Sequence, residues 1–224
     1  MMNNLFSIFD TSTSMMWNLN WLSSILNMLI LPMMFWLMPS KLMFLINKIY
    51  LMLFNELKTI LNNKFNFFNS IFFISLFLMI FLNNILGLFP YIFTSSSHMI
   101  FSLSISLSMW ISMMMFYLMN NLMFFFSHLI PSGTPNMLMP FMVLIESISN
   151  IIRPGTLAIR LTANMIAGHL LLTLLSESAN SSNFFISLSI IFIQIILLIL
   201  EFSVSIIQSY VFMILSTLYL KETN

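Results

Sequence analysis

Two arginines stand inside a long apolar stretch of this 224-residue sequence. Arg153 and Arg160 follow Glu146 and precede Asn164, at successive spacings of 7, 7 and 4 residues. At about 100° per residue, these four side chains fall within about 40° of one another on a helix. The spacing therefore predicts one polar stripe, carrying full charges, on an otherwise apolar helix.

The chemistry open to these arginines is that of a fixed positive charge. An arginine at mid-bilayer costs at least about 2.5 to 3.5 kcal/mol and is a functional candidate by default. Arg153 could snorkel to an interface, whereas Arg160 has apolar sequence on both sides. A guanidinium does not deprotonate in proteins, but it makes a nearby carboxylate release its proton. The alternative is a structural polar seam against a neighbouring helix.

Groups that do titrate lie on the same stretch and on the last apolar stretch: Glu146, His169, Glu177 and Glu201. His169 is best suited to carry a proton near neutral pH. Glu201 and Gln208 are seven residues apart and share a helix face. If the two stretches form a hairpin, His169 lies level with Glu201, and Arg160 with Gln208. Arg160 and His169 occupy nearly opposite faces of an ideal helix, so both pairings require an offset or a distortion near Gly168.

Composition places these residues in a membrane. The chain is 60% hydrophobic and 6% charged, with a mean hydropathy of +1.02, whereas soluble domains are roughly 25% charged. Residues 11–40, 65–145 and 202–220 carry no charge, and about 20 apolar residues span a bilayer. A net charge of +1 gives no reason to expect nucleic acid. The sequence has no cysteine and three scattered histidines, so we expect no metal site and no cofactor.

We expect an all-α fold in one membrane domain, residues 1–224, with about five crossing helices and one interfacial amphipathic helix. The amphipathic segment, 41–64, places lysines and asparagines on one face and apolar residues on the other. It holds four of the seven basic residues, which places it and the C-terminus on the matrix or cytoplasmic side, opposite the N-terminus. The expected crossing segments are 15–38, 67–93, 99–126, 137–176 and 183–220.

The last two crossing segments are too long to stand upright in a bilayer. At about 1.5 Å per residue each is roughly 60 Å long, against a hydrocarbon core of about 30 Å. Each segment must therefore tilt steeply or break. Pro140 and Pro154 mark where the first of them could break, although a membrane helix can also tolerate proline as a kink.

At residues 152–169 the sequence resembles subunit a of the rotary F-type ATP synthases, in its mitochondrially encoded form. The core of the resemblance is the pattern Arg-Leu-x-x-Asn-x-x-x-Gly-His, which begins at Arg160 and ends at His169. The resemblance extends upstream to Glu146 and downstream through residues 201–211. The order of crossing segments matches over the whole chain, but residues 1–135 match in pattern only.

The resemblance implies a proton-translocating stator subunit, with two offset aqueous half-channels beside a rotating ring of c subunits. It makes Arg160 the essential arginine that faces the ring carboxylate. The other implied roles are polar support by Arg153, Asn164 and Gln208, an inlet half-channel lined by His169 and Glu201, and an outlet side containing Glu146. The resemblance also implies that the last two helices form a steeply tilted hairpin.

The implied setting is the mitochondrial inner membrane, with the N-terminus in the intermembrane space and the C-terminus in the matrix. The implied partners are the c-subunit ring, the peripheral stalk and the other membrane subunits of the complex. ATP would be made elsewhere in that complex, because this chain has no phosphate-binding loop motif and only four glycines. The chain would therefore have no active site of its own.

Two other functions stay open on the sequence alone. One is a proton-pumping subunit of a redox complex, which usually relies on a lysine and a glutamate buried in mid-membrane helices. Here every lysine lies in the 41–64 segment or at the C-terminus. The other is a membrane scaffold, for which Arg160→Ala would alter assembly rather than conduction.

Overall fold

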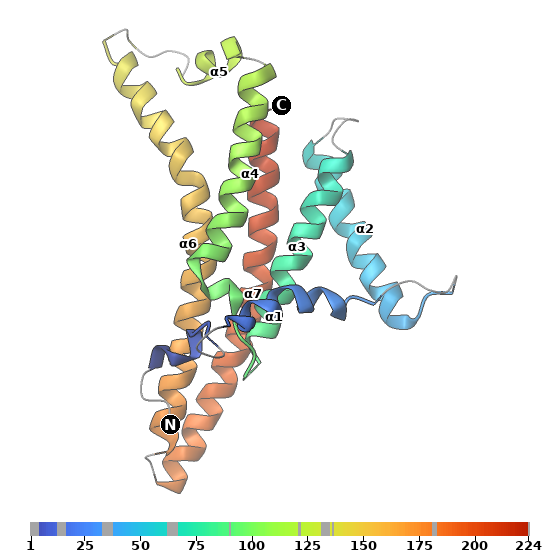
Figure 1. Ribbon diagram of the computed structural model, residues 1–224, viewed down its shortest axis with the longest axis vertical. Coiled ribbons are helices and arrows are strands. Elements are labelled where there is room, and N and C mark those ends of the chain that lie inside the picture. The colour runs from blue at the N-terminus through green and yellow to red at the C-terminus, as the bar shows by residue number, and fades with distance from the viewer. Residues whose placement is uncertain are drawn as a thin grey trace.

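All regular structure in the described part of the chain is helical, which confirms the expected all-α fold (Figure 1). The computed structural model describes residues 5–12, 17–32, 38–61, 67–89, 91–120, 122–130, 135, 137–180 and 183–223. Four of its helices are long and apolar enough to cross a membrane. They make the chain a multi-span membrane protein.

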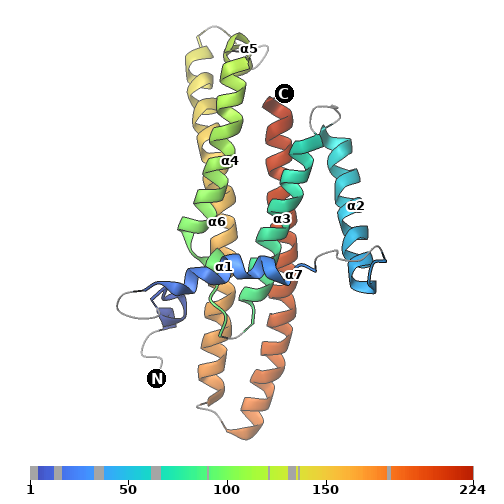
Figure 2. The ribbon, with the colours of Figure 1, turned by 45° about the vertical axis from the view of Figure 1, so that its right-hand side comes forward.

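The two longest helices form an antiparallel hairpin whose tip lies at the opposite end from the C-terminus (Figure 2). They are α6 (Met139–Asn180, 42 residues) and α7 (Phe184–Thr223, 40 residues). Pro140 occupies the first turn of α6, where a missing N–H costs little. Pro154 lies inside α6 and is buried, and the helix continues through it. Since neither helix breaks, each is about 60 Å long and fits a core of about 30 Å only when steeply tilted.

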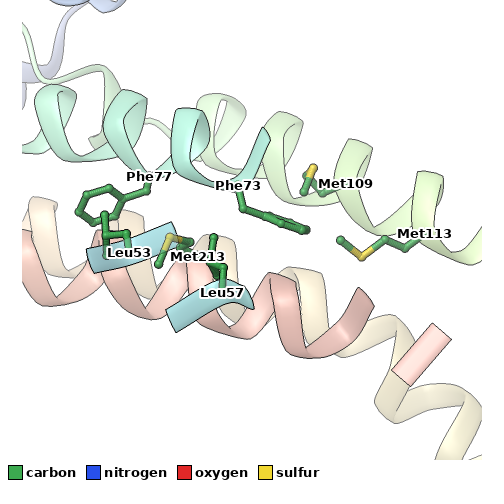
Figure 3. Close-up of a cluster of buried hydrophobic side chains, with 7 residues drawn as sticks. All are labelled: Leu53, Leu57, Phe73, Phe77, Met109, Met113 and Met213. Carbon is green, nitrogen blue, oxygen red and sulfur yellow. The ribbon is translucent and has the colours of Figure 1, made fainter. Parts of the chain in front are cut away.

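Two shorter crossing helices pack along this hairpin, with α3 (Phe67–Gly87) against α7 and α4 (Met99–Asn120) against α6 (Figure 1). Figure 3 shows the larger apolar cluster, which joins four helices through Leu53, Leu57, Phe73, Phe77, Met109, Met113 and Met213. A second cluster consists of Ile80, Leu157, Leu161 and Phe212. On α7, small buried residues allow close helix packing; they are Ser205, Ser209, Ser216 and Thr217.

The amphipathic segment is a helix, α2 (Lys41–Leu61), and residues 62–64 of the expected segment lie outside the described part. It packs against α3 and α7 through its buried face, and the Tyr210 hydroxyl donates a hydrogen bond to Glu56 over 3.0 Å. In both ribbon views α2 runs beside α3 as the second arm of a V (Figure 2). Its position at the membrane interface stays a prediction.

The expected first crossing segment contains only short helices in its described part. They are η2 (Leu19–Trp21), α1 (Leu22–Leu26) and η3 (Asn27–Ile30), preceded by η1 (Leu5–Phe9). The apolar helical run Leu19–Ile30 is shorter than a span requires, and it lies across the bundle (Figure 1). Residues 13–16 and 33–37 lie outside the described part, so the fifth crossing stays a prediction.

The boundaries of the second and third crossing segments differ from those expected. Helix α3 ends at Gly87 rather than at residue 93, and the chain turns back through η5 (Ser95–Ser97). A Cβ at Gly87 would lie 3.0 Å from Thr94, so glycine permits this close return. The stretch 99–126 is helical in its described residues, as α4 (Met99–Asn120) and α5 (Leu122–His128), and residue 121 lies outside the described part.

Candidate functional site

His169 and Glu201 line the same cavity, of about 190 Å³, between α6 and α7. Glu201 is buried, and neither of its carboxylate oxygens has a hydrogen-bond partner among the described residues. The same holds for Nε2 of His169. The hairpin therefore brings two of the expected site residues to one place.

Gly168 gives the Glu201 side chain its space in this cavity. A Cβ on Gly168 would lie 2.8 Å from Cδ and 2.9 Å from Oε1 of Glu201, which is closer than atoms of this kind approach. On the other side of the cavity, the ring of Phe9 packs edge-on against His169 with centroids 6.3 Å apart. The imidazole is thus held between η1 and the hairpin.

The cavity has room for water beside these unpartnered polar atoms. Apart from Asn164, the remaining lining is almost wholly apolar: Leu88, Met165, Ala167, Leu171, Leu197, Leu200 and Val204. The cavity volume of about 190 Å³ is well above the roughly 10–15 Å³ that one water molecule requires. A buried carboxylate with no partner costs several kcal/mol, and water in the cavity would supply its hydrogen bonds.

Arg160 lies elsewhere, with its side chain exposed on the outside of α6. Its neighbour Ile159 is half exposed, whereas Ala158 and Leu161 are buried in the bundle. In the part of the chain that the structure describes, no hydrogen bond or ion pair engages the guanidinium, and none joins it to Gln208. The structure therefore presents a cation on an apolar outer surface.

A second polar cluster surrounds Arg153 at the far end of the hairpin helices. The guanidinium donates through Nη1 to Oε2 of Glu222, and its Nη2 lies 3.8 Å from Oε1 of Glu146. It also lies over the Tyr219 ring, 5.3 Å from the centroid. These side chains line a cavity of about 270 Å³, together with Trp110 and other residues of α4 and α5.

The expected polar stripe is thus divided between three surroundings. Glu146 and Arg153 meet in the second cavity, Arg160 faces outward, and Asn164 lines the first cavity with His169. Arg160 stands between the two cavities along one unbroken helix. At about 1.5 Å per residue it is roughly 10 Å from the level of Arg153 and 13 Å from that of His169.

Sequence reasoning missed Glu222 and Tyr219. The last crossing segment was expected to end at residue 220, which left Glu222 in a polar tail. A signal was present, because Glu222 follows Gln208 by 14 residues and so repeats the seven-residue spacing of Glu201 and Gln208. By contrast, Glu177 is exposed near the end of α6 and is not among the residues that line either cavity.

Much of the outer surface of the hairpin is apolar and uncovered. Only 11% of the most apolar window of α7 is buried within the chain. Large exposed side chains on this helix include Phe192, Ile195, Ile199, Phe202 and Ile207. The described residues hold no group of three side chains suited to a metal ion. Lipid or another apolar protein surface must cover this face.

Four long apolar helices, two cavities lined by titratable side chains and an outward-facing arginine are typical of a multi-span membrane protein of the ion-translocating class. Comparison with known proteins gives the family. Residues 12–221 match the family described as ATP synthase A chain.

Curated relatives match over their whole length. An ATP synthase subunit a of Locusta migratoria is 56% identical over 223 residues, which are 99% of each chain. Those of Drosophila melanogaster and Aedes aegypti are 53% and 54% identical over 100% of each chain. The chain therefore belongs to the ATP synthase A chain family, as the motif around Arg160 predicted. It is a membrane component of the ATP synthase complex, and its role there is proton translocation in the stator.

Proposed function

We propose that this chain forms two proton half-channels, kept apart by Arg160, in a rotary ATP synthase of the mitochondrial inner membrane. The observation that carries the proposal is the arrangement along α6. One cavity with titratable side chains lies on each side of Arg160, and the helix between them is unbroken. In this proposal a proton leaves one cavity and reaches the other by a route outside this chain.

The inlet half-channel is the cavity of His169 and Glu201. Both side chains titrate, Glu201 is buried, and the half-buried His169 has its Nε2 atom buried. The cavity offers room for water that relays protons between them. Asn164 lies on this cavity at the side nearest Arg160, five residues away from His169 and four from Arg160. Asn164 supports the transfer of the proton from this cavity to the next carrier.

The next carrier is a carboxylate on a ring of c subunits, which the uncovered apolar face of α7 would contact together with Arg160. A neutral, protonated carboxyl can pass through lipid at far lower cost than a charged one. When the ring returns that carboxyl to Arg160, the guanidinium favours the charged form and the proton leaves. Because Arg160 keeps its own charge, it also repels protons from a direct path. Gln208 supports the arginine from α7.

The outlet half-channel is the cavity of Glu146 and Arg153, at the C-terminal end of α7. The basic residues of α2 support an orientation with the C-terminus in the matrix and the N-terminus in the intermembrane space. Protons then run from the His169 cavity to the Glu146 cavity, and the ring turns as they pass. The peripheral stalk and the other membrane subunits hold this chain still against the ring.

Glu201→Gln tests the inlet assignment, because the amide keeps the size of the side chain but cannot carry a proton. We expect proton-driven ATP synthesis to fall by about tenfold or more in membranes carrying the assembled complex, in line with the loss of one proton-transfer group. Glu177→Gln is the matched control, since Glu177 is exposed and lines neither cavity, and it should leave the rate unchanged. Equal rates for both variants would remove Glu201 from the proton path.

A further inference from the structure

The guanidinium of Arg153 lies between two carboxylates of the outlet cavity, those of Glu146 and Glu222, and its contacts with them differ. Its Nη1 donates a hydrogen bond to Glu222 on α7. Its Nη2 lies 3.8 Å from Oε1 of Glu146 on α6, which is beyond the usual 2.7 to 3.2 Å of a hydrogen bond. Arg153 is therefore hydrogen-bonded to the carboxylate of the neighbouring helix, whereas its ion pair with Glu146 on its own helix is longer and has no hydrogen bond.

The end of α7 holds the guanidinium at two points. Tyr219 and Glu222 are three residues apart and so occupy one face of the helix. The ring of Tyr219 lies 5.3 Å from the Arg153 Cζ, and Glu222 accepts its hydrogen bond. A stacked ring and a carboxylate together fix both the plane and the direction of the guanidinium.

The charges of the cavity do not balance. Among the described residues that line it, the titratable side chains are Tyr117 on α4, Glu146 and Arg153 on α6, and Tyr219 and Glu222 on α7. One cation thus faces two carboxylates. If Glu222 takes the cation, Glu146 is left facing a cavity of about 270 Å³ with room for water.

We propose that Glu222 is a positioning residue that keeps Arg153 from hydrogen-bonding to Glu146, and so leaves Glu146 able to take up and release protons. The inference rests on the proposed function, in which Glu146 belongs to the outlet half-channel. When the carboxylate of Glu222 is removed, the Arg153 guanidinium can rotate toward Glu146 and form two parallel hydrogen bonds with its carboxylate. A carboxylate bound in that way stays charged and no longer relays a proton.

The test is a pair of variants in membrane vesicles that carry the complete complex. Glu222→Gln alone should slow proton-driven ATP synthesis by about threefold to fivefold, the factor that a partly exposed ion pair can contribute. Arg153→Gln/Glu222→Gln should restore most of that loss, because no cation is left to capture Glu146. Glu222→Asp, which keeps the charge, should retain the rate. Lys221→Gln is the control, because it removes an exposed charge one residue away from Glu222, and it should leave the rate unchanged.

A merely structural ion pair gives the opposite pattern. In that case the double variant is no faster than Glu222→Gln, and the amount of assembled complex falls in both. This result, or an unchanged rate in Glu222→Gln, would overturn the proposal. The variant Arg160→Gln, measured in the same vesicles, tests the proposed function separately from the role of Glu222. Transport that survives Arg160→Gln contradicts the proposed function, whereas loss there without rescue in the double variant contradicts only the role of Glu222.

Discussion

Gly168 and Glu201 lie in direct contact across the α6–α7 hairpin. The space that a Cβ on Gly168 would need is occupied by the Glu201 side chain, whose Cδ would lie 2.8 Å away and whose Cγ 3.1 Å away. The carboxylate thus stands against bare helix backbone and points into the cavity that it shares with His169. The position of the Glu201 carboxylate therefore depends on the absence of a side chain at Gly168.

Gly168→Ala is therefore expected to displace the Glu201 carboxylate from the cavity. We expect proton-driven ATP synthesis to fall several-fold while the complex still assembles, because alanine is otherwise favoured over glycine in a helix by about 1 kcal/mol. Gly155→Ala is the matched control on the same helix, since no atom lies within 4 Å of its added Cβ. Equal rates in the two alanine variants would show that the contact has no functional consequence.

His169→Phe should slow proton entry into the membrane without loss of assembly. A phenyl ring can keep the edge-on contact with Phe9, but it removes the buried Nε2 that faces the cavity. The rate of ATP synthesis at fixed proton-motive force measures the effect. His169→Gln then separates two roles, because glutamine keeps hydrogen bonding but does not titrate. Full activity in the Phe variant would take His169 out of the proton path.

Single cysteines on α6 can report which side of the helix meets the c-subunit ring. The native chain has no cysteine, so each introduced thiol is unique. Ile159, beside Arg160, is 50% exposed, whereas Ala158 is fully buried. We expect Ile159→Cys to cross-link to a ring subunit and Ala158→Cys to give no product. The reverse pattern, or no product at either position, would contradict the proposed orientation of Arg160.

Asn83 fastens the N-terminal helical run to the bundle. Its Oδ1 accepts hydrogen bonds from Nδ2 of Asn27 over 2.6 Å and from Oγ of Ser95 over 3.3 Å. Asn83→Ala leaves both donors buried and unpaired, which costs about 1–3 kcal/mol. We expect faster protease cleavage within residues 5–30 of the solubilised complex. Asn55→Ala, on an exposed face of α2, should cleave at the native rate; equal rates in both variants would refute the anchoring role.

The helices could be predicted well where apolar sequence is long and uninterrupted. The expected segments 137–176 and 183–220 agree with α6 and α7 within a few residues at each end. The expected segment 99–126 likewise corresponds to α4 and α5 in its described residues. The sequence did not predict the short helices of Leu19–Ile30, whose hydrogen bonds to the α3 region depend on tertiary contacts.

The candidate site was predictable as residue types but not as surroundings. Spacing placed Glu146, Arg153, Arg160 and Asn164 on one stripe. It could not show that these side chains lie in three different surroundings, namely the two cavities and the outer surface of α6. Glu222 escaped notice because an ion pair between residues 69 positions apart leaves no local pattern. Hairpin counting showed only that the pairs His169–Glu201 and Arg160–Gln208 are consistent in level with each other, and it required an offset or a distortion near Gly168. The contact of Gly168 with Glu201 could be found only from coordinates.

The variant Arg160→Gln tests whether Arg160 acts as a fixed charge between two half-channels. The measurement is proton flux coupled to ATP synthesis in membranes carrying the complex, with the amount of assembled complex determined in parallel. We expect coupled flux to be lost while assembly stays intact, since glutamine keeps polarity but not charge. Normal coupled flux would contradict the account and leave the polar stripe as a structural seam, and loss of assembly instead of flux would favour a scaffold.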